Sequence, residues 1–403
     1  MSFLENGVTG HRGDPQHFPQ NTLEGFAAAI QMNCDWVETD IHLTRDGRSV
    51  ISHDADTRQE ADQNRVIRES DFPDLRKLNM ATFFNMTHED RAPRFDVMPS
   101  LEETLEIAKK YSDEYASQRF AQLDSKRVQY LFRRNWRELE LVVQELWQEL
   151  KDSSFRPEDF ELHFGEGGTM PAIDVKNTAM QAVLRGFVDR VDIWKKGEMH
   201  YFRVVDYKTG RKDFDYCDVF NGVGLQMLLY LFALERQGAE VVGGHPIAAG
   251  VQYFPARVPL VSADGRLTDE EAEKLRIKEW QRKGLLLGDT EVLEAMEPGG
   301  EMRRLCCTLK RDGTISGDLA DREQLKLLEQ YVFNILGKMV EEIASGDVRP
   351  NPYTRGSSHD ACTYCPYGAV CHKGQVPGRR NYKTMTAQRF WDEIRKEMSG
   401  DGR

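Results

Sequence analysis

The chain has 403 residues, of which 40% are apolar and 30% are charged, and its formal net charge is −12. This length predicts two or three domains, each large enough to bury its own core. The acidic balance argues against a protein that coats polyanions over a wide surface. It does not exclude a nuclease, because a bound metal ion supplies positive charge locally.

Apolar runs in the sequence are short, and none approaches the ~20 residues of a membrane-spanning helix. The N-terminal residues lack the basic and apolar regions of a signal peptide. The seven cysteines fit a reducing compartment with a metal or cluster site better than a disulfide framework. We therefore expect a cytoplasmic protein that does not contact a membrane.

The first hundred residues alternate between strand and helix patterns. Residues 8–13 predict a short strand that runs into a loop, 23–30 a helix, and 35–43 one alternating strand. A turn at 45–48 leads into a further strand at 49–54. Strand, helix and strand in this order are typical of the opening of an α/β barrel or sheet.

Acidic and histidine side chains mark the ends of these strands. Glu38 and Asp40 are two residues apart, so on one strand they share a face and could bind Ca²⁺ or Mg²⁺. His11 and His53 lie at strand ends, where α/β barrels place catalytic groups. Two histidines beside a metal can serve as acid and base in phosphodiester cleavage. A turn or core residue is the plainer explanation of each histidine when it is considered alone.

The order His11-Arg12, Glu38-x-Asp40 and His53-Asp54 closely resembles the glycerophosphodiester phosphodiesterase family, a (β/α)8 barrel. The resemblance implies that His11 and His53 are acid and base, that Arg12 contacts phosphate, and that Glu38 and Asp40 bind the metal. It ends near residue 111, so we expect only part of a barrel. Gln20 stands where the family usually has a glutamate.

A second pattern, from 186 to 210, predicts a β-hairpin. Residues 186–192 and 204–210 alternate as strands, and 195–198 form the turn between them. Asp206 and Lys208 then share one strand face, with Asp189 opposite Asp206. Two carboxylates can bind Mg²⁺, which activates water, and the ammonium can stabilise the transition state. The alternative is an exposed hairpin with an ordinary Asp–Lys pair.

Downstream of the hairpin, 225–236 predicts an apolar helix. Gln226 and Tyr230 are four residues apart and therefore lie on one face of it. Upstream, 160–165 predicts a strand whose Glu161 is a candidate outer metal ligand. A polar edge on a core helix is the plain explanation of the Gln–Tyr pair when it is considered alone.

Asp189, Asp206-x-Lys208 and Gln226-x3-Tyr230 in this order resemble the core of the PD-(D/E)XK nuclease superfamily. More narrowly, the stretch resembles the RecB-type exonuclease domain of AddB-type recombination nucleases. The resemblance implies that Asp189 and Asp206 bind Mg²⁺, that Lys208 acts on the water or the transition state, and that Gln226 and Tyr230 support the site. It further implies DNA as substrate and an AddA-type helicase-nuclease subunit as partner.

Three cysteines near the C-terminus, Cys362, Cys365 and Cys371, have the spacing of metal ligands. The same resemblance implies that they are three of the four thiolates on a [4Fe–4S] cluster. The family's fourth cysteine has no counterpart here. Zinc is the alternative occupant, with His359 or His372 as a fourth ligand.

These patterns together predict an α/β protein with a PD-(D/E)XK core preceded by a partial (β/α)8 barrel. The expected parts are the phosphodiesterase-like segment 1–111, a helical connector 112–152, the nuclease domain 153–376 and a tail 377–403. The expected function is a Mg²⁺-dependent DNA exonuclease in double-strand-break repair and recombination. The alternatives are a glycerophosphodiester phosphodiesterase and a catalytically impaired fragment that binds DNA or a helicase.

Overall fold

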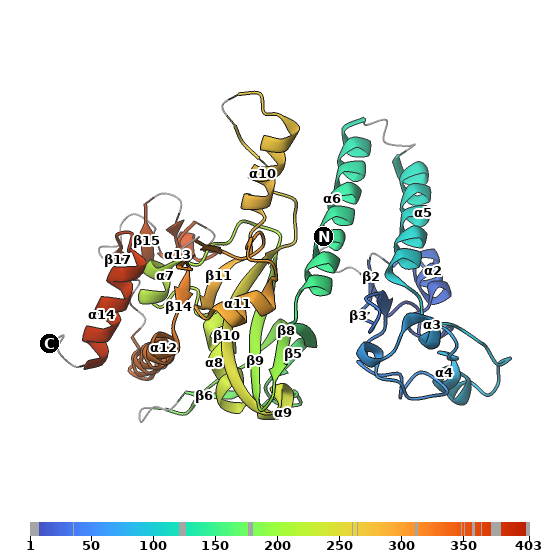
Figure 1. Cartoon of the computed structure of the whole chain (residues 1–403), viewed down its shortest axis with the longest axis horizontal. Coiled ribbons are helices and arrows are strands. Elements are labelled where there is room, and N and C mark those ends of the chain that lie inside the picture. The colour runs from blue at the N-terminus through green and yellow to red at the C-terminus, as the bar shows by residue number, and fades with distance from the viewer. Residues whose placement is uncertain are drawn as a thin grey trace. The chain divides into compact units, whose positions relative to one another are not determined.

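The computed structural model describes residues 8–34, 36–120, 126–175, 180–259, 261–263, 265–310, 313–347, 349, 351–356, 359–363, 365–371 and 380–399, apart from the side chains of 115–120, 128, 132, 359 and 369. The chain forms two compact units, Met1–Lys151 and Asp152–Arg403 (Figure 1). None of the described helices combines the length and apolar character that a membrane crossing needs. The four-part division predicted from the sequence stays a prediction.

The first unit opens with a β-α-β arrangement. Strands β1 (Thr9–His11) and β2 (Trp36–Glu38) are parallel, and helix α2 (Leu23–Gln31) connects them. The hydroxyl of Thr22 caps α2 by accepting a hydrogen bond from the Gly25 amide at 3.2 Å. A parallel strand–helix–strand unit is the element that a (β/α)8 barrel repeats.

The strand predicted over 35–43 is wrong as a single element. It is divided into β2, which pairs with β1, and β3 (Ile41–Leu43), which pairs antiparallel with β4 (Ser49–Ile51). The break falls at Thr39 and Asp40, where the Thr39 hydroxyl donates to the Asn21 side chain and the Asp40 carbonyl accepts from the Ser52 amide. Glu38 and Asp40 therefore do not share the face of one regular strand.

The other named elements of the first unit are helices, and a small core in this unit includes Val50, Ile67 and Leu75. These helices are η1 (Ile67–Glu69), α3 (Phe72–Leu75), α4 (Thr82–Thr87), α5 (Leu101–Phe120) and α6 (Lys126–Asp152), whose last residue already belongs to the second unit.

The second unit is built on a six-stranded mixed sheet with the strand order β14-β11-β10-β9-β8-β5. Its strands are β5 (Arg156–Phe164), β8 (Gly186–Lys196), β9 (Met199–Lys208), β10 (His245–Pro255), β11 (Lys283–Leu287) and β14 (Leu319–Ala320). The predicted hairpin is present: β8 and β9 are antiparallel, and Gly197 at the turn has a φ of +60°. Two residues at the turn and a positive φ are typical of tight hairpins.

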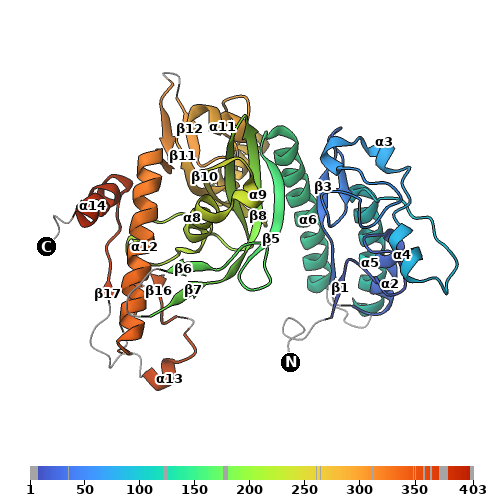
Figure 2. The same ribbon diagram turned by 90° about the horizontal axis from the view of Figure 1, so that it is seen from below.

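Helices cover the sheet in successive layers. Figure 2 shows α8 (Gln226–Gln237) between the sheet and α12 (Arg322–Ala344), with α14 (Ala387–Ser399) beyond α12. Seven of the twelve α8 residues are buried, and Leu231, Phe232, Ala233 and Leu234 are 0% exposed. The main hydrophobic core therefore lies on the side of the sheet that this apolar helix covers.

The remaining elements are short and lie around the sheet. They are β6 (Ile173–Val175), β7 (Ala182–Leu184), α7 (Tyr216–Phe220), α9 (Ala239–Val242), α10 (Asp269–Glu279), α11 (Thr290–Met296), β12 (Cys307–Leu309), β13 (Ile315–Gly317), β15 (Tyr353–Arg355), β16 (His359–Asp360), α13 (Gly368–Cys371) and β17 (Arg380–Asn381).

Charged side chains are buried inside the central strands. The Arg190 Nε atom lies 2.8 Å from the carboxylate of Asp192, and Arg203 Nε donates to the same carboxylate at 2.8 Å. Arg203 also donates to the Gln252 side chain at 2.9 Å. The three charged groups are at most 1% exposed. A carboxylate shared by two guanidiniums offsets part of the large cost of burying them.

Candidate active site

The end of the β8–β9 hairpin brings Asp189, Asp206 and Lys208 together. The strand pairing runs to Arg190 opposite Val205, which leaves Asp189 beside Asp206 at the next position. The Lys208 ammonium forms an ion pair with the Asp206 carboxylate. The Asp189 carboxylate accepts a hydrogen bond from the Tyr207 amide at 2.9 Å. The two carboxylates therefore lie next to each other, each with one cationic or N–H partner.

Electrostatics at this position favour a bound cation. Burial raises the pKa of Asp206; the ion pair with Lys208 opposes that shift, and the charge and hydrogen bond of Asp189 add to it. Two neighbouring carboxylates repel each other when both are ionised, and a divalent cation between them removes that repulsion. The donor set therefore fits Mg²⁺. Among the described residues, no group of three or more His, Cys, Asp or Glu side chains is arranged to hold a metal, so water or substrate oxygens would complete the shell.

Gln226 and Tyr230 form a pair on α8, as their spacing predicted. The Gln226 side-chain amide donates to the Tyr230 hydroxyl at 3.0 Å. Tyr230 is buried and stacks on Phe164, with ring centroids 5.5 Å apart. Gly186, at the start of β8, passes so close that an added Cβ would lie 2.4 Å from the Tyr230 hydroxyl oxygen. Tyr230 therefore fixes α8 to the strand that carries Asp189.

Glu161 lies across from Asp189 in the β5–β8 pairing, between the pairs of Phe160 with Arg190 and of Leu162 with Val188. Its backbone has a φ of +51°, a left-handed conformation that is uncommon outside glycine. Such a residue interrupts the regular alternation of the strand. Its role as an outer ligand stays a prediction.

A second cluster of polar residues lies in the first unit. His11 Nε2 is 3.6 Å from the Glu38 carboxylate, and His53 Nδ1 is 2.8 Å from Asp54. Burial and the charge of Glu38 raise the pKa of Asp40, whereas the charges of His53 and Arg12 lower it. The structure therefore places all five predicted phosphodiesterase residues in one neighbourhood, although Glu38 ends β2 and Asp40 lies in the break between β2 and β3.

Two buried carboxylate oxygens of this cluster, one each on Glu38 and Asp40, accept no hydrogen bond from the described residues. Oxygen atoms of this kind suit Ca²⁺ or Mg²⁺. Glu60 is a further member of this cluster that no sequence motif indicated. Its carboxylate accepts a hydrogen bond from the Gln20 side chain at 2.7 Å, and Gln20 in turn accepts one from Arg12 at 3.1 Å. Burial and the charge of Asp54 raise the pKa of Glu60 to about 7.

The cysteines of the C-terminal motif lie near the surface, without a described set of convergent metal ligands. Cys362 and Cys371 are partly exposed and Cys365 is exposed, and the described residues contain no convergent set of ligands around them. His372 and the side chain of His359 lie outside the described residues. The [4Fe–4S] and zinc assignments stay predictions, and no step of the chemistry below depends on them.

Comparisons with known proteins agree with the geometry of the second unit. The sequence profile of the PD-(D/E)XK nuclease superfamily matches residues 86–372. The chain is 35% identical over 287 residues to an ATP-dependent helicase/deoxyribonuclease subunit of Thermoanaerobacter sp. (strain X514), a match that covers 69% of this chain and 25% of the relative. The protein of the same name from Clostridium acetobutylicum is 33% identical over 285 residues, with 69% and 25% covered.

The chain thus spans about a quarter of the length of these curated relatives. Among solved structures, a phosphodiesterase of Oleispira antarctica in complex with sn-glycerol-3-phosphate is 28% identical over 26% of this chain and 41% of that chain, with a TM-score of 0.24. A putative glycerophosphoryl diester phosphodiesterase of Silicibacter pomeroyi is 23% identical over 32% and 54%, with a TM-score of 0.25.

Proposed function

Because the chain belongs to the PD-(D/E)XK nuclease superfamily, we propose that its second unit is a Mg²⁺-dependent nuclease that hydrolyses phosphodiester bonds in DNA. The observation that carries the proposal is the convergence of Asp189, Asp206 and Lys208 at the end of one hairpin. A bound divalent cation would supply an activated water and neutralise charge on the scissile phosphate.

The residues of the chain have separate tasks in this proposal. Asp189 and Asp206 hold the cation, and the Tyr207 amide fixes the Asp189 carboxylate in place. Lys208 lies beside Asp206 and directs its ammonium towards the negative charge that develops on the phosphate. Tyr230 and Gln226 act through packing, because their mutual hydrogen bond and the contact with Gly186 hold α8 against β8.

Degradation of labelled single-stranded DNA by the purified chain tests the proposal. Asp206→Asn and Lys208→Ala should each lower the Mg²⁺-dependent rate by about 10²–10³, the usual effect of losing a group that stabilises transition-state charge. Asp174→Asn is the matched control, since Asp174 is an exposed residue of β6. Activity that is equal in the wild type and in both site variants would disprove the assignment.

We further propose that the chain works beside an ATP-driven helicase subunit, as the names of its relatives suggest for those proteins. The chain contains no Gly-x4-Gly-Lys-Ser/Thr motif, so it would depend on a separate motor to open duplex DNA. Blunt duplex should then be degraded only when an AddA-type subunit and ATP are added, whereas single strands should be degraded by the chain alone. Repair of double-strand breaks is the process that such an activity would serve.

The cluster around Glu38 and Asp40 supports a second candidate reaction in the first unit. Two histidines, an arginine and two carboxylate oxygens that accept no hydrogen bond from the described part of the chain would suit cleavage of a small phosphodiester. Release of glycerol 3-phosphate from glycerophosphocholine in the presence of Ca²⁺ or Mg²⁺, and its loss in His11→Ala, is the expected result. A wild-type chain that releases none would remove this candidate without affecting the nuclease.

A further inference from the structure

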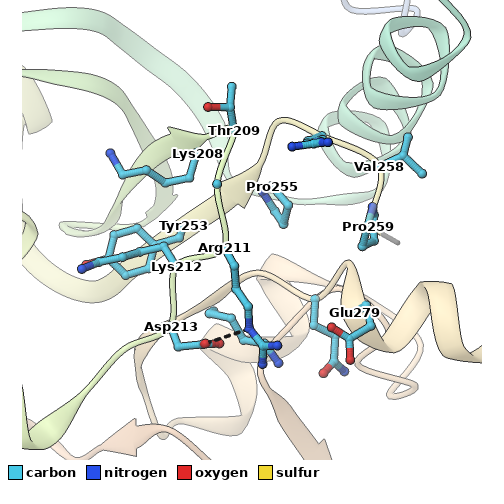
Figure 3. A pocket seen from close by; sticks show the side chains of 14 residues that line it. Lys208, Thr209, Arg211, Lys212, Asp213, Tyr253, Pro255, Val258, Pro259 and Glu279 are labelled. Atoms are coloured by element: carbon cyan, nitrogen blue, oxygen red, sulfur yellow. Dashed lines mark hydrogen bonds and ion pairs between the residues drawn. The ribbon is translucent and has the colours of Figure 1, made fainter. Parts of the chain in front are cut away.

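A cavity of about 300 Å³ opens directly beside Lys208 in the second unit (Figure 3). Its walls come from four segments: the loop that continues β9 to Asp213, the end of β10 with the residues after it, the end of α10, and the start of β11 with Gln281 before it. The volume is at the lower end of the range found for small-ligand sites. Lys208 belongs both to the candidate active site and to this cavity.

The cavity has a strongly positive lining in an acidic chain. Five cationic side chains line it against two carboxylates, those of Asp213 and Glu279. Lys208 is paired with Asp206, and Arg211 lies 3.1 Å from Asp213. The other three, Lys212, Arg257 and Lys283, form no ion pair within the described part of the chain. Lys283 is nonetheless near Asp318: burial raises the pKa of that carboxyl, and the charge of Lys283 opposes the shift. Cationic groups that form no salt bridge can pair with a phosphate ligand.

Part of the cavity lining is apolar and aromatic. Tyr253, Pro255, Val258 and Pro259 contribute to it, and the Lys212 ammonium lies 5.9 Å from the centre of the Tyr253 ring. Figure 3 shows the Lys212 chain extending across Tyr253. Apolar surface beside cations matches a nucleotide unit, which presents a base and a sugar next to its phosphate.

Strand register connects the cavity to the paired carboxylates. Asp206 on β9 pairs with Tyr253 on β10, and Tyr253 pairs with Lys283 on β11. These side chains form a row across one face of the sheet. Asp206 and Tyr253 are also close enough to interact electrostatically. Burial and the charge of Asp206 raise the pKa of Tyr253 to about 12. A polymer chain held at the carboxylates would therefore continue into the cavity.

We propose that this cavity binds one nucleotide unit of single-stranded nucleic acid adjacent to the scissile bond, with its phosphate on Lys212 and Lys283 and its sugar and base against Tyr253 and Pro255. The inference rests on the proposed nuclease function and adds the residues that position the substrate. It concerns binding, so it makes a prediction that does not require turnover.

Fluorescence anisotropy of a fluorescein-labelled oligothymidylate in EDTA measures that binding without cleavage. Lys212→Gln, Lys283→Gln and Arg257→Gln should each weaken binding about ten-fold, the effect of one charge-assisted hydrogen bond. Lys326→Gln on the exposed surface of α12 is the matched control and should bind as the wild type does. Because Arg257 lies in an exposed loop, its variant reports on the cavity without disturbing the sheet.

Measurements of cleavage rate and of competition by small ligands distinguish a failure of this inference from a failure of the proposed function. In Mg²⁺, Lys283→Gln should raise KM more than it lowers kcat, whereas Asp206→Asn should lower kcat. Thymidine monophosphate should compete with the oligonucleotide better than inorganic phosphate does. Equal competition would show that the cavity binds anions in general and would overturn the nucleotide assignment. Wild-type cleavage together with unchanged binding in all three cavity variants would refute the inference alone. Oligonucleotide binding that depends on these residues, with no cleavage, would refute the nuclease proposal alone.

Discussion

Individual buried charges decide much of the stability of the second unit. Asp192 is the carboxylate that both Arg190 and Arg203 contact, and all three side chains are at most 1% exposed. We predict that Asp192→Ala destabilises the unit by about 3–5 kcal/mol, the usual effect of removing one partner from a buried ion pair. Denaturant unfolding at neutral pH measures this change.

The comparison with Asp192→Asn sharpens that test. Asparagine keeps the shape and one acceptor oxygen but removes the negative charge, so the difference between the two variants separates the hydrogen bonds from the electrostatic attraction. A loss below about 1 kcal/mol in both variants would contradict the role assigned to Asp192.

Glu60 predicts a pH dependence in the first unit. Its folded pKa of about 7 lies above the ordinary value of 4.5, chiefly because of burial. A carboxyl with a raised folded pKa contributes its stability below the unfolded pKa and loses it as the pH rises through the folded value. At about 1.4 kcal/mol per pKa unit, the first unit should lose on the order of 3 kcal/mol between roughly pH 4.5 and 7.

Glu60→Gln should remove that dependence, because the amide keeps the hydrogen bond with Gln20 and cannot ionise. Hydrogen exchange of peptides from the first unit, followed across this pH range, is the measurement. Glu89→Gln is the control, since Glu89 is exposed and should leave the wild-type pH profile unchanged. A wild-type profile that is flat through pH 7 would refute the prediction.

At the scale of elements, the contact between β8 and α8 depends on the small size of Gly186. An alanine Cβ would lie 2.4 Å from the Tyr230 hydroxyl oxygen and 3.2 Å from two ring carbons. Tyr230 cannot move aside easily, because it is buried against Phe164. We predict that Gly186→Ala destabilises the unit by about 1–3 kcal/mol, as overpacking of a core usually does, and lowers nuclease activity.

Tyr230→Phe in the same chain should restore part of the lost stability, since it removes the atom that the new methyl group meets. Thermal unfolding of the two single variants and the double variant forms a complete cycle. Strictly additive effects would show that the two residues do not interact.

The elements that sequence reasoning predicted well are those with a local signal. The hairpin turn at Gly197 and the apolar helix α8 follow from turn chemistry and helical spacing. The convergence of Asp189 with Asp206 and Lys208 followed from the same hairpin, because the position of the turn fixes which residues of the two antiparallel strands lie opposite each other.

Features that depend on distant pairing were not predictable in this way. The strand expected over 35–43 is divided because its halves find different partners, β1 and β4. Glu60 carries no motif, and only the fold brings it to Gln20. The cavity beside Lys208 requires β10 and β11 to lie next to β9, an order that no local pattern encodes.

For the whole molecule, an acidic chain with a local positive cavity predicts a modest salt dependence of DNA binding. Three cations without an ion-pair partner in the described residues, Lys212, Arg257 and Lys283, line the cavity. Each neutralised phosphate on a single strand contributes about −0.7 to the slope of log K against log salt, so the one phosphate held in the cavity should give a slope of about −0.7. Titrations of the oligonucleotide at several KCl concentrations in EDTA give this slope.

Lys283→Gln should make the slope shallower, because it removes one of the two cations on that phosphate, whereas Lys326→Gln should not change it. A wild-type slope several times steeper would mean that the DNA follows a much wider basic surface than this cavity, and would contradict the charge distribution described above.

The buried Arg190–Asp192–Arg203 group also affects how accurately β8 and β9 pair during folding. Strand side chains alternate, so slipping β9 by one residue against β8 would exchange its faces, moving the Arg203 guanidinium away from Asp192 and turning Asp206 and Lys208 away from Asp189. The misaligned hairpin would lose the buried Arg203–Asp192 salt bridge and the alignment of the candidate site in the same step. The register that gives the most stable hairpin is therefore also the one that brings Asp189, Asp206 and Lys208 together.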